Sequence, residues 1–236
     1  MPELLLLDET DSTNDRAKEL ARAGAPHGAA VLARRQTAGR GRMGRSFLSP
    51  EGGLYLSAVL RPELPPDRWP LVTPLAAVAV CRAVERETGV SCAVKWVNDL
   101  LLGGKKLCGI LCESAGGAVV CGVGLNLRPP PGGWPPELRD LATALPVPVD
   151  RAALARAVLH ELLTLCAALP DTGFLDEYRA RSAVPGKAVT VRDPNGDYDA
   201  VAEGIDDRAG LVVALPDGTR RTLRAGEISI RPKEEL

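Results

Sequence analysis

Short apolar stretches alternate with polar, turn-forming stretches through the first ninety residues of the chain. Apolar residues dominate segments 4–7, 29–36 and 54–60, which predicts three strands. Cap-type side chains before an apolar helical pattern, and a glycine after it, predict helices over about residues 14–23 and 73–89. This mixture of elements indicates an α+β fold.

A hairpin is expected in the next part of the chain. Segments 93–102 and 105–113 flank Gly103-Gly104, and such a glycine pair is typical of a two-residue turn between antiparallel strands. A further strand is expected over residues 119–127. Alternate positions of that strand lack bulky side chains on one face, namely Gly122, Gly124 and Asn126.

A tight turn at the glycine pair sets the register of the hairpin. Lys95 would then lie opposite Cys112, and Asp99 opposite Cys108. Because alternate residues of a strand share a face, Lys95, Asp99 and Lys106 are expected on the same surface as the two cysteines. The pattern therefore predicts a polar, partly cationic surface on the sheet.

The second half of the chain divides into a connection, a helix and a β-rich tail. Seven prolines lie between residues 128 and 149, and a helix is expected over 150–169. Turn signals separate short strands beyond residue 186: Asn195-Gly196, Asp206-Asp207 and Pro216-Asp217-Gly218. We therefore expect a mixed β-sheet with flanking helices over residues 1–184 and a small β-barrel over residues 185–236.

The composition is that of an ordinary globular protein. Of the 236 residues, 45% are hydrophobic and 25% charged, and the net charge is -1. These values exclude collagen, coiled-coil and disordered chains, and they give no general attraction to nucleic acid. The longest apolar run, 75–81, is far shorter than the ~18 residues that cross a bilayer, and the first residues lack the basic region of a signal peptide. We expect a cytoplasmic protein without a membrane segment.

Six cysteines occur without a Cys-x-x-Cys pair, and the two histidines, His27 and His160, lie far apart in the sequence. This spacing does not favour a structural zinc site, and we interpret the cysteines as small buried residues. A cysteine nucleophile is the alternative, because Cys108 and Cys112 are expected beside Lys95. No histidine is placed to act as its base, so covalent catalysis is disfavoured.

Residues 37–45, named here the Gly/Arg loop, contain three glycines and three arginines. The string Gly39-x-Gly41-x-x-Gly44 matches a dinucleotide-binding fingerprint, but that fingerprint requires a helix directly after it. The following segment contains Pro50 and leads into a strand. Two interpretations are left: a solvated basic turn, or a loop that closes over an anionic ligand, since glycines permit close approach and arginines bind carboxylate or phosphate with paired donors.

Two features of the strands also indicate an anionic ligand. Lys95 lies in the apolar run 93–97, where an unpaired ammonium is costly to bury unless an anion lies beside it. Gly122 and Gly124, inside a strand, are explained either by close approach of a ligand or by tight packing of a helix. With the Gly/Arg loop, these residues predict a small-molecule site.

Five segments together resemble the signature of biotin protein ligases. In chain order they are residues 11–14 (Asp-Ser-Thr-Asn), 36–45 (Gln followed by the Gly/Arg loop), 95–99 (Lys-Trp-Val-Asn-Asp), 106–113 and 122–126. The resemblance extends over nearly the whole chain, although Val97 stands where the family usually has proline. It implies a class II synthetase-like catalytic domain over residues 1–184 and an SH3-like barrel over residues 185–236.

The resemblance also implies the reaction. Biotin reacts with ATP to give biotinyl-AMP and pyrophosphate, and the biotinyl group then passes to a lysine of a biotin carboxyl carrier protein of the acetyl-CoA carboxylase type. Mg²⁺ is expected to arrive with ATP, without direct protein ligands. Because the chain begins close to the first motif, we expect a ligase without a DNA-binding repressor domain, and a homodimer is compatible with the family.

Residue roles follow from the same resemblance. Lys95, Arg40 and Arg42 are expected to offset the repulsion between the biotin carboxylate and the α-phosphate. Asp99 is expected to orient or deprotonate the acceptor lysine, or to form a structural ion pair with Lys106. The expected biotin-binding residues are Ser12, Thr13, Asn14, Gln36, Gly39, Arg40, Gly41, Lys95, Gly109, Gly122 and Gly124. The expected ATP-binding residues are Arg42, Arg45, Lys106 and Asn126.

Two other functions are left open by the sequence. A related enzyme that attaches lipoate or octanoate would share the fold, but its pocket should lack the polar residues that suit a ureido ring. A nucleic-acid-binding module that uses the Gly/Arg loop is the non-enzymatic alternative. Few aromatic residues, 3 Trp, 3 Tyr and 2 Phe, are available for base stacking, which disfavours it.

Overall fold

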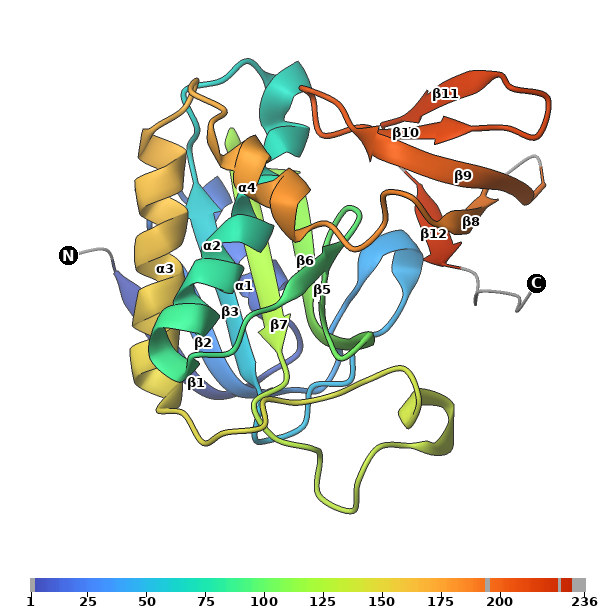
Figure 1. The fold of residues 1–236 in the computed structure, drawn as a ribbon. Coiled ribbons are helices and arrows are strands. Elements are labelled where there is room, and N and C mark those ends of the chain that lie inside the picture. Colours follow the sequence, from blue (N-terminus) through green and yellow to red (C-terminus); the bar gives the residue numbers. More distant parts are fainter. Residues whose placement is uncertain (1–2, 194–195, 225, 231–236) are drawn as a thin grey trace.

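The larger part of the molecule is built on a seven-stranded mixed sheet. The computed structural model describes residues 3–193, 196–224 and 226–230. The strand order is β1-β2-β3-β7-β6-β5-β4, with β1 parallel to β2 and every other neighbouring pair antiparallel (Figure 1). The strands are β1 (Leu4–Thr10), β2 (Ala30–Gln36), β3 (Leu54–Leu60), β4 (Ala93–Lys95), β5 (Asp99–Leu102), β6 (Lys105–Ala115) and β7 (Ala118–Leu125). The mixed sheet expected from the sequence is confirmed.

Helices cover both faces of this sheet. On one face, Ala17 and Ala21 of α1 (Thr13–Arg22) pack against small branched side chains such as Val59 and Val120. On the other face, α2 (Val72–Thr88) and α3 (Arg151–Ala167) bury the main apolar core (Figure 1). The remaining helical segments are α4 (Phe174–Arg181), η1 (Arg42–Gly44), η2 (Pro66–Leu71) and η3 (Pro136–Leu138).

Helix ends follow the local signals in the sequence. Gly89 ends α2 in the left-handed conformation, with φ 71°. Asp150 caps α3, because its carboxylate accepts a hydrogen bond of 2.8 Å from the Ala153 N–H. Helix α4 has no counterpart among the expected elements. Within the described ranges, no helix combines the length and apolarity that a membrane crossing requires.

The C-terminal part forms a second, five-stranded antiparallel sheet. Its order is β11-β10-β9-β8-β12, and the expected turns at Asp206-Asp207 and at residues 216–218 lie between its strands. Asn195 of the other expected turn lies outside the described residues. The strands are β8 (Ala188–Arg192), β9 (Tyr198–Ile205), β10 (Leu211–Ala214), β11 (Arg220–Leu223) and β12 (Glu227–Ile230). Over the described part of the chain, the edge strands β11 and β12 are not paired, so the sheet is open and no closed barrel is seen.

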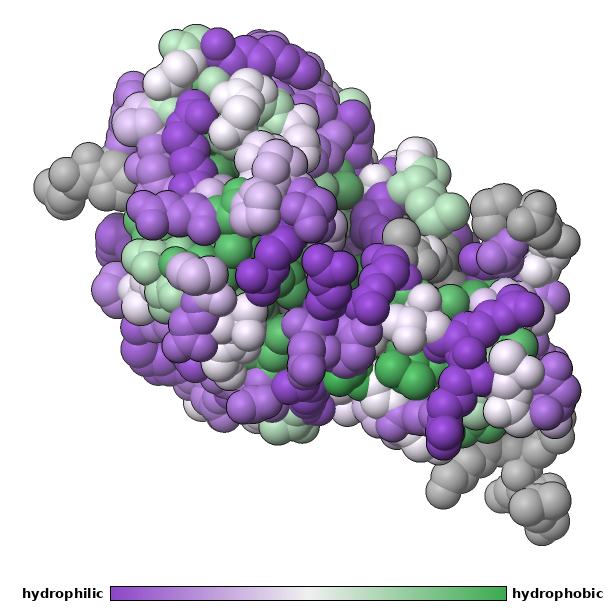
Figure 2. Space-filling view, turned by 90° about the horizontal axis from the view of Figure 1, so that it is seen from above, coloured by the Kyte–Doolittle hydropathy of each residue, from purple (hydrophilic) through white to green (hydrophobic). Residues whose placement is uncertain are grey.

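The second sheet packs against the turn between β4 and β5. The Trp96 indole N–H donates a buried hydrogen bond of 2.9 Å to the Ala209 carbonyl. From α4, the Tyr178 hydroxyl donates to the Val97 carbonyl at 3.1 Å, and Arg179 donates to the Ile205 carbonyl at 3.0 Å. Figure 2 shows the smaller part beside the larger one, with small hydrophobic areas between mostly hydrophilic surfaces. The two sheets therefore meet at the turn that follows Lys95.

The hairpin over residues 93–113 has a different register from the expected one. The chain turns back at residues 96–98, so Lys95 lies opposite Asp99, and not opposite Cys112. Pairing next to the glycine turn is as expected, but a bulge between Leu100 and Leu101 then shifts the register by one residue. Asp99 consequently lies opposite Gly109 and not opposite Cys108.

The register shift also reverses the expected positions of the cysteines. A shift of one residue moves a side chain to the other face of the sheet. Cys108 is fully buried in the apolar core with α2, and the half-buried Cys112 packs against that core. The prediction that both cysteines share a surface with Lys95 is therefore wrong.

Candidate functional site

One cavity gathers nearly all the residues singled out in the sequence. It lies on the α1 side of the large sheet, between β6, β7, the start of α1 and the Gly/Arg loop. Of the expected site residues, the following line it: Ser12, Thr13, Asn14, Gln36, Arg40, Gly41, Arg42, Arg45, Lys95, Asp99, Lys106, Gly109, Gly122 and Gly124. Gly39 and Asn126 are the two expected residues that do not.

Uncharged polar side chains form one end of the cavity. Gln36, at the end of β2, accepts hydrogen bonds from the Thr13 N–H at 2.8 Å and from the Thr13 hydroxyl at 2.9 Å, and its amide donates to Ser49 at 2.8 Å. Ser12 occupies the N-cap position of α1, but its side chain makes no cap hydrogen bond and lines the cavity instead. This end of the cavity offers hydrogen-bonding groups without net charge.

The glycines of β6 and β7 leave room for side chains from other elements. A Cβ atom at Gly122 would lie 2.0 Å from the Asn14 Oδ1 atom, and one at Gly124 would lie 2.6 Å from the Phe47 ring. A Cβ at Gly109 would lie 3.1 Å from Phe47. Packing of helix and loop side chains thus explains why these strand positions lack a side chain, while all three glycines still line the cavity.

Charged residues form the other end. Lys95 and Asp99 come from the paired ends of β4 and β5, and the Asp99 carboxylate lies 2.8 Å from the Lys106 ammonium. Of the two alternatives for Asp99, the ion pair with Lys106 is present in the structure. Lys95 lines the same space, and its ammonium has no hydrogen bond or ion pair with any residue that the structure describes. A cation at this position can receive an anionic ligand.

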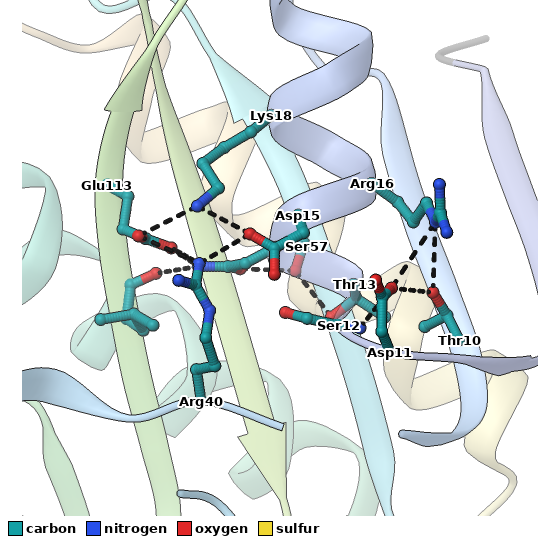
Figure 3. A network of polar contacts seen from close by, with 12 residues as sticks. Thr10, Asp11, Ser12, Thr13, Asp15, Arg16, Lys18, Arg40, Ser57 and Glu113 are labelled. Atoms are coloured by element: carbon teal, nitrogen blue, oxygen red, sulfur yellow. Dashed lines mark hydrogen bonds and ion pairs between the residues drawn. The ribbon is translucent and has the colours of Figure 1, made fainter. Parts of the chain in front are cut away.

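The Gly/Arg loop crosses the cavity and is fastened by its arginines. Arg42 donates to the Asn98 Oδ1 atom at 3.1 Å. Figure 3 shows that Arg40 reaches Asp15 on α1 and Glu113 on β6, at 2.8 and 2.9 Å. Arg40 therefore lies on two carboxylates. The sequence alone placed it only as a free cation for an anionic ligand.

Gly39 serves the loop itself. A Cβ atom there would lie 2.4 Å from both the Phe47 carbonyl oxygen and the Ser49 hydroxyl. The Phe47 N–H also donates to the Gly39 carbonyl at 2.8 Å. Only glycine permits this close approach of the two loop strands.

Asn126 follows β7 on the side of the irregular connection. Its side-chain amide donates to the Thr143 carbonyl at 2.9 Å, and its backbone N–H donates to Leu107. In this position Asn126 holds the 140s segment against the sheet, outside the cavity lining.

The thiols are not arranged for nucleophilic catalysis. Burial raises the pKa of Cys108 well above its ordinary value. The pKa of Cys112 is lowered, first by a hydrogen bond with Cys121, but its side chain belongs to the opposite side of β6 from Lys95. Within the described ranges, no three His, Cys, Asp or Glu side chains come together as metal ligands.

Several cavity residues were missed by the sequence reasoning. Phe47 covers two of the glycines, and the Lys106 ammonium lies 5.8 Å from its ring centroid. Glu113, which lies behind the lining and accepts a hydrogen bond from Asn14, was identified in the sequence only as the end of a motif. Gly226 and Ile228 reach the cavity from the second sheet. No local signal links these residues, because the fold brings them together from distant segments.

Sequence profiles of two families match the chain. The profile of the biotin/lipoate A/B protein ligase family matches residues 6–128, which include every segment lining the uncharged end of the cavity. The profile of the biotin protein ligase C terminal domain matches residues 185–231.

Individual relatives extend over almost the whole chain. It is 35% identical over 240 residues to a biotin–[acetyl-CoA-carboxylase] ligase of Paracoccus denitrificans, covering 94% of this chain and 98% of that one. It is 35% identical over 235 residues to the bifunctional ligase/repressor BirA of Bacillus subtilis, covering 94% of this chain and 72% of that one. The structure of the biotin protein ligase from Aquifex aeolicus in complex with biotin and ATP superposes with a TM-score of 0.83 at 28% identity, covering 98% of this chain and 99% of that one.

Proposed function

This chain belongs to the biotin/lipoate A/B protein ligase family and is an ATP-dependent biotin protein ligase. We propose that both steps, formation of biotinyl-AMP and transfer of the biotinyl group, take place in the cavity described above. The observation that carries this proposal is the Lys95 ammonium. It lines the cavity from the strand position opposite Asp99, without a partner among the described residues.

Biotin lies with its ureido ring at the uncharged end. Ser12, Thr13 and Gln36 supply donors and acceptors there, and Asn14 adds an amide beside Gly122. A neutral ring that both donates and accepts hydrogen bonds suits such a set better than a charged group does. The other lining residues proposed to contact biotin are Arg40, Gly41, Lys95, Gly109 and Gly124, while Gly39, outside the lining, lets the loop fold back on itself.

Formation of biotinyl-AMP brings two anions together. A carboxylate oxygen of biotin attacks the α-phosphorus of ATP, and the bond to the pyrophosphate oxygen breaks. At ~4 Å and an effective dielectric constant of ~20, two like charges repel by about 4 kcal/mol. The Lys95 ammonium, held in place by the β4–β5 pairing, bridges the two and offsets this repulsion.

ATP occupies the end of the cavity nearest the basic residues. Arg42, Arg45 and Lys106 line this part, and we propose that they bind the nucleotide phosphates. Asn126 contributes from outside the lining by holding the 140s segment. Mg²⁺ enters bound to the triphosphate, whose charge it offsets.

Transfer of the biotinyl group needs a neutral amine. The acceptor lysine of the carrier domain attacks the carbonyl carbon of the mixed anhydride, AMP leaves, and a proton is lost from the amine. Asp99 lies four residues after Lys95 and directly opposite it in the hairpin, so it orients or deprotonates this amine. Lys106 holds the carboxylate in place until then.

Mass spectrometry of a purified carrier domain tests the proposal. We expect the mass of one biotinyl group after incubation with the protein, biotin, Mg²⁺ and ATP, and none when lipoate replaces biotin. Lys95→Met should lower the rate of biotinyl-AMP formation by roughly 10²-fold. Lys105, which pairs with Asp140, is the control, and Lys105→Met should form biotinyl-AMP at the wild-type rate. Equal adenylation by the two variants would refute the role of Lys95.

Other features belong to the same proposal. We propose a catalytic domain over residues 1–184 and a C-terminal domain over residues 185–236, a division supported by the two separate sheets and by the second family profile. We propose that the C-terminal sheet is an open relative of an SH3-like barrel. We also propose a cytoplasmic enzyme whose acceptor is a biotin carboxyl carrier protein, which does not use nucleic acid as a partner, and which can form a homodimer.

A further inference from the structure

Four charged side chains alternate in sign beside the Gly/Arg loop (Figure 3). The Arg40 guanidinium lies 2.8 Å from Asp15 and 2.9 Å from Glu113. The Lys18 ammonium lies 2.8 Å from the same Asp15 and 3.1 Å from the same Glu113. We call these residues the charged ring; two cations and two anions leave it without net charge.

The charged ring joins a loop to two rigid elements. Asp15 and Lys18 lie on α1, Glu113 lies on β6, and Arg40 lies in the loop. Backbone hydrogen bonds fasten the loop at its base, where the Gln36 N–H donates to the Ser49 carbonyl at 3.0 Å. Arg40 therefore ties the middle of the loop to the sheet and the helix.

Glu113 does not line the cavity itself, but it contacts Asn14, which does. Its Oε2 atom accepts a hydrogen bond of 2.9 Å from the Asn14 amide. Asn14 is buried, donates as well to the Leu111 carbonyl at 3.1 Å, and lies 2.7 Å from the Ser57 hydroxyl through its Oδ1 atom. One carboxylate thus contacts both the loop and a wall of the uncharged end.

Glu113 and Lys18 form the more buried half of the charged ring, whereas the side chains of Arg40 and Asp15 are 40% and 36% exposed. Exposed pairs contribute little because water competes for both charges. Here the side chains of Glu113 and Lys18 are 27% and 12% exposed, and three donors converge on Glu113, from Arg40, Lys18 and Asn14. Hydrogen bonds to a charged group in such a partly buried place are the stronger kind.

We propose that Glu113 is a positioning residue for biotin binding. We also propose that Arg40 is a latch that holds the Gly/Arg loop closed through its ion pairs with Asp15 and Glu113. The loop closes over the uncharged end when Arg40 binds the charged ring, and Glu113 at the same time fixes Asn14 against Gly122. This inference rests on the proposed biotin position. It gives Arg40 a role in closure, while Lys95 and Arg42 face the reacting anions.

The test is a Glu113→Gln variant. Its side chain keeps its length and can still accept from Asn14, but it loses the charge that binds Arg40 and Lys18. We expect the Kd for biotin to rise roughly tenfold, as for loss of a charged hydrogen bond, with faster biotin dissociation. The rate of biotinyl-AMP formation at saturating biotin should be unchanged. Higher NaCl should weaken biotin binding to the wild type more than to the variant.

Glu19→Gln is the matched control. Glu19 lies on α1 and, like Glu113, pairs with an arginine, Arg16, at 2.9 Å. Unlike Glu113, it has no hydrogen bond or ion pair with Arg40 or Asn14. The substitution removes the same charge, and biotin binding should equal that of the wild type. A Glu113→Gln variant that binds biotin as the control does would overturn the positioning role of Glu113 in biotin binding.

A second variant allows the test to be made even if Glu113→Gln does not fold. Arg40→Met breaks the ring from the loop side, and we expect the same loss of biotin affinity as in Glu113→Gln. The double variant should lose no more than either single variant, because both remove one latch. Additive losses, or an Arg40→Met variant that loses rate but not biotin affinity, would contradict the latch.

Trypsin distinguishes failure of this inference from failure of the proposed biotin site. In the ligand-free proteins, cleavage after Arg42 and Arg45 should be faster in Glu113→Gln than in the wild type and in Glu19→Gln. Faster cleavage with unchanged biotin affinity would mean that the latch exists but biotin lies elsewhere. Equal cleavage of all three proteins would overturn the latch whatever the biotin affinity.

Discussion

The Lys106 ammonium lies 2.8 Å from the Asp99 carboxylate, although the strand register pairs Asp99 with Gly109 and Lys106 with Leu101. Because of the bulge between Leu100 and Leu101, Asp99 and Lys106 are not directly opposite each other in the strand pair, but their side chains lie on the same surface. The Lys106 ammonium therefore holds Asp99 in a fixed place, with its charge matched, on the strand pair that also carries Lys95.

An Asp99→Asn variant should separate the two steps of the reaction. The amide keeps the size of the side chain but cannot take a proton from the acceptor lysine, so transfer from preformed biotinyl-AMP should slow by about 10²–10⁴-fold. Formation of biotinyl-AMP should change much less. Single-turnover transfer to a carrier domain measures this, and equal transfer rates in variant and wild type would remove the base role.

The space over Gly122 predicts a variant that is defective in both stability and biotin binding. A Gly122→Ala side chain would lie 2.0 Å from the Asn14 Oδ1 atom, and Asn14 is buried and hydrogen-bonded to β6. We expect the free energy of unfolding to fall by about 1–3 kcal/mol, with weaker biotin binding, measured by urea unfolding and calorimetry.

Gly204 provides the matched control for this substitution. It also lies inside a strand, β9, and a Cβ atom there would meet nothing within 4 Å. Gly204→Ala should change the free energy of unfolding by less than about 0.5 kcal/mol and leave biotin binding unchanged. A Gly122→Ala variant as stable as Gly204→Ala would contradict the packing described here.

The hydrogen bond between Trp96 and Ala209 should connect the second sheet to catalysis. Trp96→Phe keeps an aromatic ring but leaves the buried Ala209 carbonyl without its donor, which should cost about 1–3 kcal/mol of stability. Because Lys95 and Asp99 flank this turn, the rate of biotinyl-AMP formation should also fall. Thermal unfolding and pyrophosphate release measure the two effects.

Trp69→Phe separates lost stability from lost activity. Trp69 donates a comparable hydrogen bond of 3.0 Å, but to the Leu64 carbonyl five residues away along the chain and not from the β4–β5 turn to the second sheet. We expect it to lower stability to a similar degree without slowing adenylation. If both variants slow adenylation equally, the second sheet does not act through Trp96.

The thiols should react in an order set by their pKa values. The pKa of Cys112 is lowered, first through its hydrogen bond with Cys121, so the reactive thiolate is present at a lower pH than for an ordinary cysteine. Burial raises the pKa of Cys108 and keeps it as an unreactive thiol. Iodoacetamide should modify Cys112 before Cys108. The rate of Cys112 modification should begin to rise at a pH below the pKa of an ordinary cysteine.

Peptide mass spectrometry at several pH values follows this order, and earlier modification of Cys108 would contradict it. Cys108→Ala should also form biotinyl-AMP at the wild-type rate, because its side chain lies in the core and not in the cavity. Loss of adenylation in a folded Cys108→Ala protein would reopen covalent catalysis.

The sequence by itself determined the elements and most of the cavity. Local signals such as Gly89 after α2 and Asp150 before α3 act over a few residues, and they placed these helices to within about two residues of the structure. Residue type and spacing along the chain were enough to identify the Gly/Arg loop, Lys95 and Gly122, because such motifs are recognised without knowing any contact between distant residues.

Only the tertiary structure decided which groups meet. Arg40 lies 25 residues from Asp15 and 73 from Glu113 along the chain, and Trp96 lies 113 residues from Ala209. The bulge that reversed the faces of Cys108 and Cys112 results from strand pairing, since a hairpin register depends on packing of both faces as well as on its turn. Residue type limits what a side chain can bind, whereas the folded backbone brings its partner within reach.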